Sequence, residues 1–165
     1  MDKKLKPDSK TLGKKRLGLW LRLFTDTALI EKQTRRLLRT HFGVTLPQFD
    51  LMAALDRAPG GMTMGELSKQ LLVSNGNVTG VVERLQQEGL VKRWPLPTDR
   101  RIYSVGLTAK GRSTFREMAE SHEGWVNEIL SDMDEAAVDE MTRHLDFLRD
   151  SLKKKADEET SGSRK

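Results

Sequence analysis

Two adjacent arginines, Arg100 and Arg101, follow Asp99 in a polar loop that begins with Pro95 and Pro97. Guanidinium groups bind phosphate, and an arginine inserted into a narrow minor groove of DNA meets an enhanced negative potential. A carboxylate is a poor phosphate contact, but Asp99 can orient a neighbouring guanidinium through a fork-like pair. These residue types favour contact with a polyanion. The alternative interpretation is a charged loop kept polar for solubility.

A second group of candidate residues lies on one face of a helix that we expect Ser74 to cap. Its apolar residues recur at i, i+3, i+4 and i+7, which predicts a buried stripe of Val78, Val81, Val82 and Leu85. The other side and its edges carry Asn75, Gly76, Asn77, Thr79, Gly80 and Arg84. Amides pair with adenine edges, hydroxyls reach bases or phosphates, and glycine lets a backbone approach, so this face suits the major groove of DNA. A surface helix with a polar face is the alternative.

The segment before this helix favours the DNA-binding interpretation. A T-x-x-E capping box from Thr63 to Glu66 predicts a short helix, and a three-residue turn at 72–74 then leads into the polar-faced helix. A short helix, a tight turn and a second helix have the spacing of a helix-turn-helix, whose second helix enters the major groove.

The segment after the polar-faced helix explains the position of the arginine loop. Gly89 is expected to end the helix, and residues 90–94 and 102–107 read as two strands joined by the loop 95–101. A two-stranded wing with a basic tip therefore adjoins the helix-turn-helix. Residues 45–108 are predicted to form a winged helix-turn-helix that binds double-stranded DNA.

The remaining segments are predicted to be helical, so the fold class is mainly α. Residues 17–44 form a long first helix that stops near Gly43, and a T-x-x-Q capping box from Thr45 to Gln48 begins the next. Residues 109–152 form two C-terminal helices, capped by Thr108 and restarted near Asp134. In the last helix a 3, 4, 3, 4 spacing of Val138, Met141, Leu145, Leu148 and Leu152 predicts a seam. This seam packs against another helix, either within the chain or in a second subunit.

Charge is distributed unevenly along the 165 residues, whose formal net charge is +5. Residues 84–112 carry seven basic residues against two acids, whereas residues 113–152 carry three basic residues against eleven acids. One part of the chain should attract polyanions and another should repel them. The basic tails 1–16 and 153–165 have few apolar anchors and are expected to be disordered.

Several function classes are excluded or disfavoured by composition. The chain has no cysteine, which removes disulfides and thiolate chemistry and fits a cytoplasmic location. It has no run of 18 apolar residues, so no membrane partner is expected. Motifs of serine hydrolases, phosphate-binding loops and zinc proteases are missing, and His41, His122 and His144 fall on separate predicted helices. We expect no catalytic residues, no cofactor and no metal.

The wing pattern D-x-R-x-x-x-V-x-L-T-x-x-G is met by Asp99, Arg101, Val105, Leu107, Thr108 and Gly111. Upstream, NVTGVVERLQQEGLVKR at residues 77–93 includes Thr79, Arg84, Leu85, Gly89 and Arg93. Together these segments resemble the winged helix-turn-helix of the MarR family of bacterial transcription regulators, and the likeness extends over about residues 17–152. The resemblance implies that Arg101 enters the minor groove with Asp99 bracing it, while Arg100 touches phosphate.

The resemblance also implies a homodimer and a small-molecule effector. In the family the first and the last two helices interlock with those of a second subunit, and effectors occupy a cleft beside the winged domain. Here the corresponding segments supply Trp20, Phe24, Arg36, Arg39, His41, Phe49 and Met52 as effector-binding candidates. Aromatic walls with guanidinium groups suit an anionic aromatic molecule. The stretch SNGNVTG at 74–80 is similar to the branch that senses hydroxycinnamates or their coenzyme A thioesters.

Two hypotheses about function remain at this point. The first is a homodimeric repressor that leaves a near-palindromic operator when it binds an anionic aromatic effector. The second is a helical scaffold or protein-interaction module with a winged-helix fold that no longer reads DNA. Arg101 with its bracing Asp99 favours the first, and salt-dependent retention on DNA or heparin would separate the two.

Overall fold

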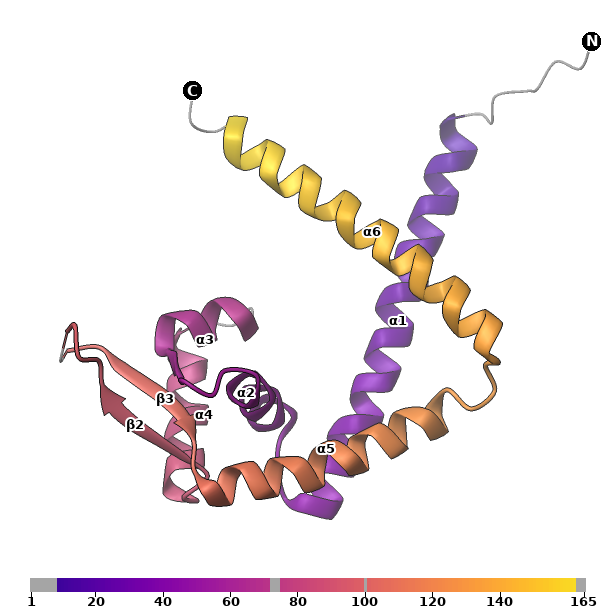
Figure 1. Ribbon diagram of the computed structural model, residues 1–165. Coiled ribbons are helices and arrows are strands. Elements are labelled where there is room, and N and C mark those ends of the chain that lie inside the picture. The colour runs from indigo at the N-terminus through magenta and orange to yellow at the C-terminus, as the bar shows by residue number, and fades with distance from the viewer. Residues whose placement is uncertain (1–8, 72–74, 100, 163–165) are drawn as a thin grey trace, which may run out of the picture. The chain divides into compact units, whose positions relative to one another are not determined.

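The computed structural model describes residues 9–71, 75–99 and 101–162, so Ser74 and Arg100 lie outside the described residues. Within these ranges the chain forms six helices and a small antiparallel sheet (Figure 1). The helices are α1 (Ser9–Phe42), α2 (Leu46–Asp56), α3 (Met64–Leu71), α4 (Asn75–Gln87), α5 (Ala109–Ile129) and α6 (Glu135–Gly162). The strands are β1 (Met62–Thr63), β2 (Val91–Pro95) and β3 (Tyr103–Leu107). The predicted class, mainly α with a winged helix-turn-helix, is confirmed.

The sheet has the strand order β1-β3-β2, and both pairings are antiparallel. The predicted two-stranded wing is the β2–β3 hairpin, which projects beyond α3 and α4 in Figure 1. The third strand, β1, was not predicted from the sequence. It is only two residues long and leads directly into α3, so it shows no alternation, and its pairing of Met62 with Val105 is visible only in the fold.

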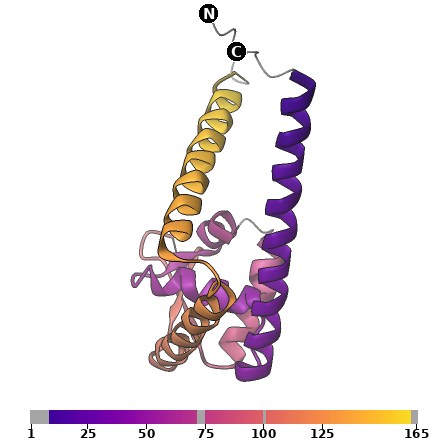
Figure 2. The same cartoon turned by 90° about the vertical axis from the view of Figure 1, so that its right-hand side faces the viewer.

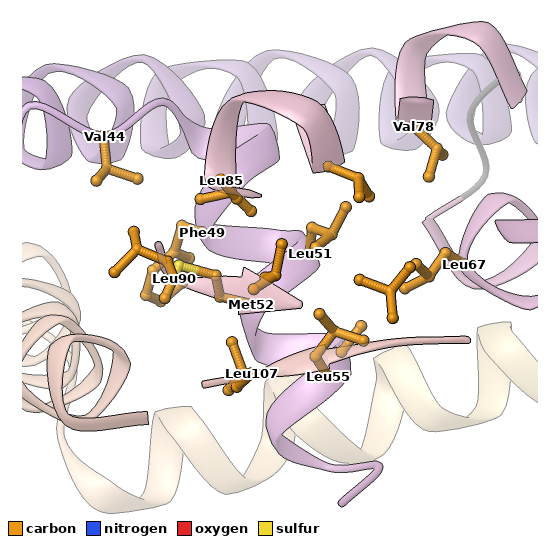
Figure 3. Packing of buried hydrophobic residues seen from close by; sticks show 14 of the residues in the cluster. Val44, Phe49, Leu51, Met52, Leu55, Leu67, Val78, Leu85, Leu90 and Leu107 are labelled. Atoms are coloured by element: carbon orange, nitrogen blue, oxygen red, sulfur yellow. The ribbon is translucent and has the colours of Figure 1, made fainter. Parts of the chain in front are cut away.

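The core of the first compact unit, Met1–Trp125, is built around α2. Four large apolar side chains of this helix are buried, namely Phe49, Leu51, Met52 and Leu55. Figure 3 shows them among residues from α3, α4, β3 and the neighbouring loops, including Leu67, Val78, Leu85, Leu90 and Leu107. Because α4 and β3 contribute to the same core, the helix-turn-helix and the wing hold each other in place.

The capping devices predicted from the sequence are formed. The Gln48 side chain accepts hydrogen bonds from the backbone N–H and the hydroxyl of Thr45, both at 2.9 Å. Glu66 accepts from the N–H of Thr63 at 2.7 Å and from its hydroxyl at 2.8 Å, and these two bonds hold the pKa of Glu66 below its usual range. Gly43 has a positive φ at the end of α1, as expected for a residue that stops a helix.

A close backbone contact joins the end of α4, the start of β2 and the start of α5. The Thr108 hydroxyl donates to the carbonyl of Gly89 at 2.8 Å and accepts from the N–H of Gly111 at 2.9 Å. A Cβ built on Gly111 would lie 1.9 Å from the carbonyl oxygen of Leu90. Only glycine therefore allows α5 to approach β2 this closely, which gives the Thr108–Gly111 part of the wing pattern a physical reason.

Both terminal helices are longer than the sequence predicted. Residues 9–16 and 153–162 were expected to belong to disordered tails, but they continue α1 and α6 as helix. Figure 2 shows α1 as one unbroken helix. Both segments are rich in lysine, and the second also contains glutamate and alanine, which have high helix propensity. An existing helix therefore extends into them without apolar anchors, because elongation is much easier than nucleation.

The second compact unit, Val126–Lys165, contains the end of α5 and all of α6. The predicted restart near Asp134 is confirmed, because its carboxylate accepts a hydrogen bond from the N–H of Ala137 at 2.8 Å. Along α6 the predicted seam leaves several large apolar side chains exposed, namely Val138, Met141, Leu145 and Leu152. Across both units, none of the described helices is long and apolar enough to cross a membrane.

The Gly111 contact generates a stability prediction. Gly111→Ala should lower the free energy of unfolding by about 1 to 3 kcal/mol, because the new methyl group collides with the Leu90 carbonyl. Gly124→Ala on the same helix is the matched control, since a Cβ there meets nothing within 4 Å. It should leave stability unchanged or raise it by about 0.5 to 1 kcal/mol. Chemical denaturation followed by circular dichroism measures both, and equal stability of the two variants would contradict the close contact.

Candidate nucleic-acid interface

The polar face of α4 is presented outward, as its pattern predicted. Val78, Val82 and Leu85 are buried in the core, and Val81 packs against it. On the other side Gly76, Asn77, Gly80 and Arg84 are exposed, and Thr79 is half-buried. No described residue would lie within 4 Å of a Cβ at Gly76 or Gly80, so packing within the described part of the protein does not require glycine at either position. The open backbone there is suited to a partner that comes close to the helix.

Arg84 lies near the C-terminal end of this face. Its Nε is 3.5 Å from the Oε1 of Glu88, and its side chain is well exposed. An exposed pair on one helix contributes only about 0.3 to 0.5 kcal/mol, so Glu88 does not prevent the guanidinium from binding a phosphate. The predicted role of Arg84 as a phosphate contact is compatible with this geometry and remains a prediction.

The wing tip contains the fork-like pair that the sequence led us to expect. Arg101 Nε lies 3.2 Å from Asp99 Oδ1, and Arg101 Nη2 lies 3.3 Å from Oδ2. The backbone N–H of Arg101 also donates to Oδ1 at 2.9 Å. These bonds lower the pKa of Asp99, which keeps the carboxylate ionised at neutral pH. The Arg101 side chain is 91% exposed, so it is oriented by Asp99 without being covered.

Trp94 packs the wing against the loop before β1, a role that sequence reasoning missed. A Cβ on Gly106 would lie 2.7 Å from its ring, and a Cβ on Gly61 would lie 2.6 Å from it. The indole therefore occupies space that two glycines leave free on β3 and on the loop before β1. Lys92 adds a cation–π contact, with its Nζ 5.6 Å from the ring centre. The glycine at position 106 inside a strand was the available signal, because such glycines often mark close packing.

Arg93, which is part of the segment 77–93 that resembles the MarR family, is half-buried on β2. It pairs with Val105 across the sheet, and its Nε and Nη2 are buried without a hydrogen-bond partner among the described residues. These two nitrogen atoms of Arg93 are therefore not available to bind phosphate.

The structure brings together only part of the predicted effector-binding set. Arg36 and Arg39 line a hollow of about 420 Å³ with Arg35, Thr45 and Leu46, which we call the arginine hollow. Arg35 forms an ion pair with Glu31 on α1. The guanidinium groups of one helix thus gather at the start of α2, where an anion would meet several of them.

The aromatic candidates do not line the arginine hollow. Trp20 and Phe24 stack on each other on α1 with ring centres 5.8 Å apart, and both are exposed. Phe49 and Met52 are buried in the core. His41 packs on Trp125 with ring centres 5.4 Å apart. The sequence placed these residues correctly on α1 and α2, but helical spacing cannot distinguish a core aromatic from one that faces a ligand.

A metal site has no support within the described ranges, where no group of three or more histidines and acids is placed to hold an ion. His122 instead contacts the ring of Phe49, with ring centres 5.0 Å apart. His144 lies 3.8 Å from Glu140 on the exposed side of α6.

Comparison with known proteins shows which family has this fold and a similar sequence. A profile of the MarR family matches residues 42–102. A MarR family transcriptional regulator from Silicibacter pomeroyi, known from its crystal structure, is 32% identical with a TM-score of 0.72, over 88% of this chain and 99% of that one. The transcriptional activatory protein BadR of Rhodopseudomonas palustris is 29% identical over 79% of this chain and 74% of its own length.

The similarity includes a structure that contains DNA. The crystal structure of a mutant MarR from E. coli complexed with operator DNA is 25% identical with a TM-score of 0.66, over 76% of this chain and 92% of that one. The predicted winged helix-turn-helix therefore occurs in a known class of protein. The chain belongs to the MarR family of DNA-binding transcriptional regulators, and it is not an enzyme.

Proposed function

We propose that the chain acts in the cytoplasm as a homodimeric repressor that leaves a near-palindromic operator when it binds a small anionic aromatic effector. A phenolic acid or its coenzyme A thioester is the effector class that the sequence favours. The observation that carries the DNA-binding part is the wing tip, where Asp99 orients the exposed Arg101. A guanidinium held in this way loses little conformational freedom on entering a minor groove.

The two halves of the interface have different tasks in this proposal. The α4 face enters the major groove, where Asn77 and Thr79 reach base edges and Arg84 binds phosphate. The wing places Arg101 in the adjacent minor groove. Ser74 and Arg100 remain predicted contacts outside the described residues, and Asn75 remains one at the first position of α4.

The exposed apolar face of α1 supports the homodimer. Leu17, Trp20, Leu21 and Phe24 are each between 49% and 65% exposed. A continuous apolar stripe of this kind on a soluble regulator usually marks an interaction site. A second copy of the same face is a self-complementary partner under twofold symmetry, and two recognition helices about 34 to 36 Å apart then reach successive major grooves. Sedimentation of the purified chain tests the dimer directly.

The arginine hollow supports an anionic effector. Arg36 and Arg39 offer guanidinium groups to a carboxylate or phosphate, while Leu46 supplies an apolar contact. Because the hollow lies where α1 meets the start of α2, an occupant could change how the dimer helices hold the DNA-binding part. Such a change would alter the spacing of the two recognition helices without any contact between effector and DNA.

The scaffold hypothesis and the direction of regulation are tested together. A scaffold that no longer reads DNA would not be retained on an operator column even at low salt. In transcription reactions with purified components, a repressor lowers output from its own operator and the effector restores it. The opposite result would assign the chain an activating role, the one that the name of BadR describes for that protein.

The wing assignment predicts a large difference between two basic residues. Arg101→Ala should weaken operator binding by about 1 to 3 kcal/mol, because the minor-groove contact is lost. Lys110→Ala is the control and should cost much less, since its Nζ is already held by the Glu88 carbonyl at 2.9 Å. Fluorescence anisotropy with labelled operator at fixed salt measures both. Equally small losses would remove Arg101 from the interface.

The α4 assignment predicts that two neighbouring substitutions affect different properties. Thr79→Ala should reduce discrimination among operator variants, because base contacts specify sequence. Arg84→Ala should weaken binding to all sequences together and reduce the salt dependence by about one charge, because phosphate contacts carry no sequence information. Binding is measured against a panel of single-base operator variants at several salt concentrations. A change of base preference in the Arg84 variant alone would show that the helix is misoriented here.

The arginine hollow predicts that effector and operator oppose each other. Arg39→Ala should reduce affinity for an anionic aromatic effector and leave effector-free operator binding nearly intact. By linkage, operator DNA must weaken effector binding by the same factor that the effector weakens operator binding. Effector titrations with and without operator measure this factor. Unchanged effector affinity in both the Arg36→Ala and the Arg39→Ala variants would exclude the hollow as the effector site.

A further inference from the structure

A second hollow, of about 430 Å³, lies beside the arginine hollow in the same compact unit. Residues of four helices line it, and they are Glu31, Arg35, Leu46, Pro47, Asp50, Leu51, Leu71, Asn77, Val78 and Val81. Arg35 and Leu46 belong to both hollows. We call this one the acidic hollow. Its volume is within the range of small-molecule sites, and six of its lining residues are apolar.

The charges of the acidic hollow leave one carboxylate in excess. Glu31 and Arg35 form an ion pair on α1, so their charges largely offset each other. Asp50 is the remaining charged residue in the lining, and in the described parts of the chain its carboxylate has no ion pair and no hydrogen bond. The site therefore presents an apolar wall and a net negative charge, because Arg35 offsets the charge of Asp50 only in part.

The surroundings of Asp50 make a positively charged partner favourable. Its side chain is exposed at the rim of the hollow, yet neighbouring helices take enough water from the carboxylate to raise its pKa. Glu31 also raises this pKa, while Arg35 and His122 lower it. A cation bound at the rim would replace the missing hydration and restore the balance of charge.

We propose that the acidic hollow binds an organic cation, a molecule with an apolar body and a protonated amine that pairs with Asp50. The apolar body lies against Leu51, Val78 and Val81, and the amine donates a charge-assisted hydrogen bond to the carboxylate. An anion would face the carboxylate of Asp50 and is rejected. The chain thus has two adjoining ligand sites with opposite charge preference, and the cation does not require the proposed anionic effector in order to bind.

The position of the acidic hollow connects it to DNA binding. Asn77, Val78 and Val81 belong to α4, so a bound cation touches the helix that reads the operator. Val78 is part of the buried stripe that fixes α4 against α2 (Figure 3). An occupant that holds this stripe in place changes operator affinity, and operator DNA changes the affinity for the cation by the same factor.

Three probes of nearly equal shape test the charge preference. Isothermal titration calorimetry of the full chain compares tryptamine, its neutral alcohol tryptophol and the anion indoleacetate. We expect tryptamine to bind about tenfold more tightly than tryptophol, because a hydrogen bond to a charged group contributes that much, and we expect no binding of indoleacetate at this site. Equal affinity for the amine and the alcohol would overturn the proposal, as would a failure of tryptamine to bind.

Matched variants then assign the site. Asp50→Asn should weaken tryptamine about tenfold and leave tryptophol unchanged, whereas Asp56→Asn, an exposed acid on the same helix, should change neither. Val81→Phe should reduce binding of both probes by filling the hollow. Circular dichroism confirms that each variant is folded. Arg39→Ala should leave tryptamine binding intact, which separates this site from the arginine hollow. Unchanged tryptamine affinity in the Asp50 variant would overturn the assignment.

Discussion

The contact between the backbone of Gly111 and the carbonyl of Leu90 is the constraint on which the DNA-binding part depends. At this point α4 has just ended, β2 begins and α5 starts, and the Thr108 hydroxyl bonds two of the three segments. Leu90 is also tied back into α4 by its N–H, which donates to Leu85 at 2.9 Å. The recognition helix, the wing and the fifth helix are therefore joined by short backbone links that have little freedom to shift.

This junction supports the proposed role of the charged loop as a positioned DNA contact. The hairpin is fixed at one end by the Leu90 region and along its length by Trp94, which fills the space above Gly106. At the far end the Asp99 fork restricts the guanidinium of Arg101. The Leu90 region, Trp94 and the Asp99 fork each restrict the wing in the absence of DNA. Less conformational entropy would therefore be lost when the wing binds DNA. The exposed pair itself adds little stability, and its value lies in orientation.

The sequence predicted the features that local chemistry determines. The capping boxes at Thr45 and Thr63, the helix stop at Gly43 and the Asp99–Arg101 pair all involve residues within a few positions of each other. The sequence did not predict β1, the packing of Trp94 against Gly61 and Gly106, or the two hollows, because each of these features depends on residues far apart in the chain. Phe49 shows the same limit. Its helical spacing was compatible with a ligand wall or a core, and the packing of Phe115 and His122 around it decided for the core.

In the proposed regulation, the route from ligand to DNA passes through α2. The start of this helix lines both hollows through Leu46, while its buried face packs against α3, α4 and β3. A ligand that displaces the start of α2 must therefore disturb the core that also positions α4 and the wing, since closely packed interiors transmit displacement instead of absorbing it.

Cation and anion would act on the same helix from adjoining sites that share Arg35. Whether the two ligands strengthen or weaken each other's binding then depends on whether the Arg35 guanidinium interacts with Asp50 or with the anion. A cation at Asp50 takes over the charge balance that Arg35 supplies in part, and this leaves Arg35 freer to bind an anion on its other side. We therefore expect the two ligands to bind with positive cooperativity, and the coupling must be equal in both directions.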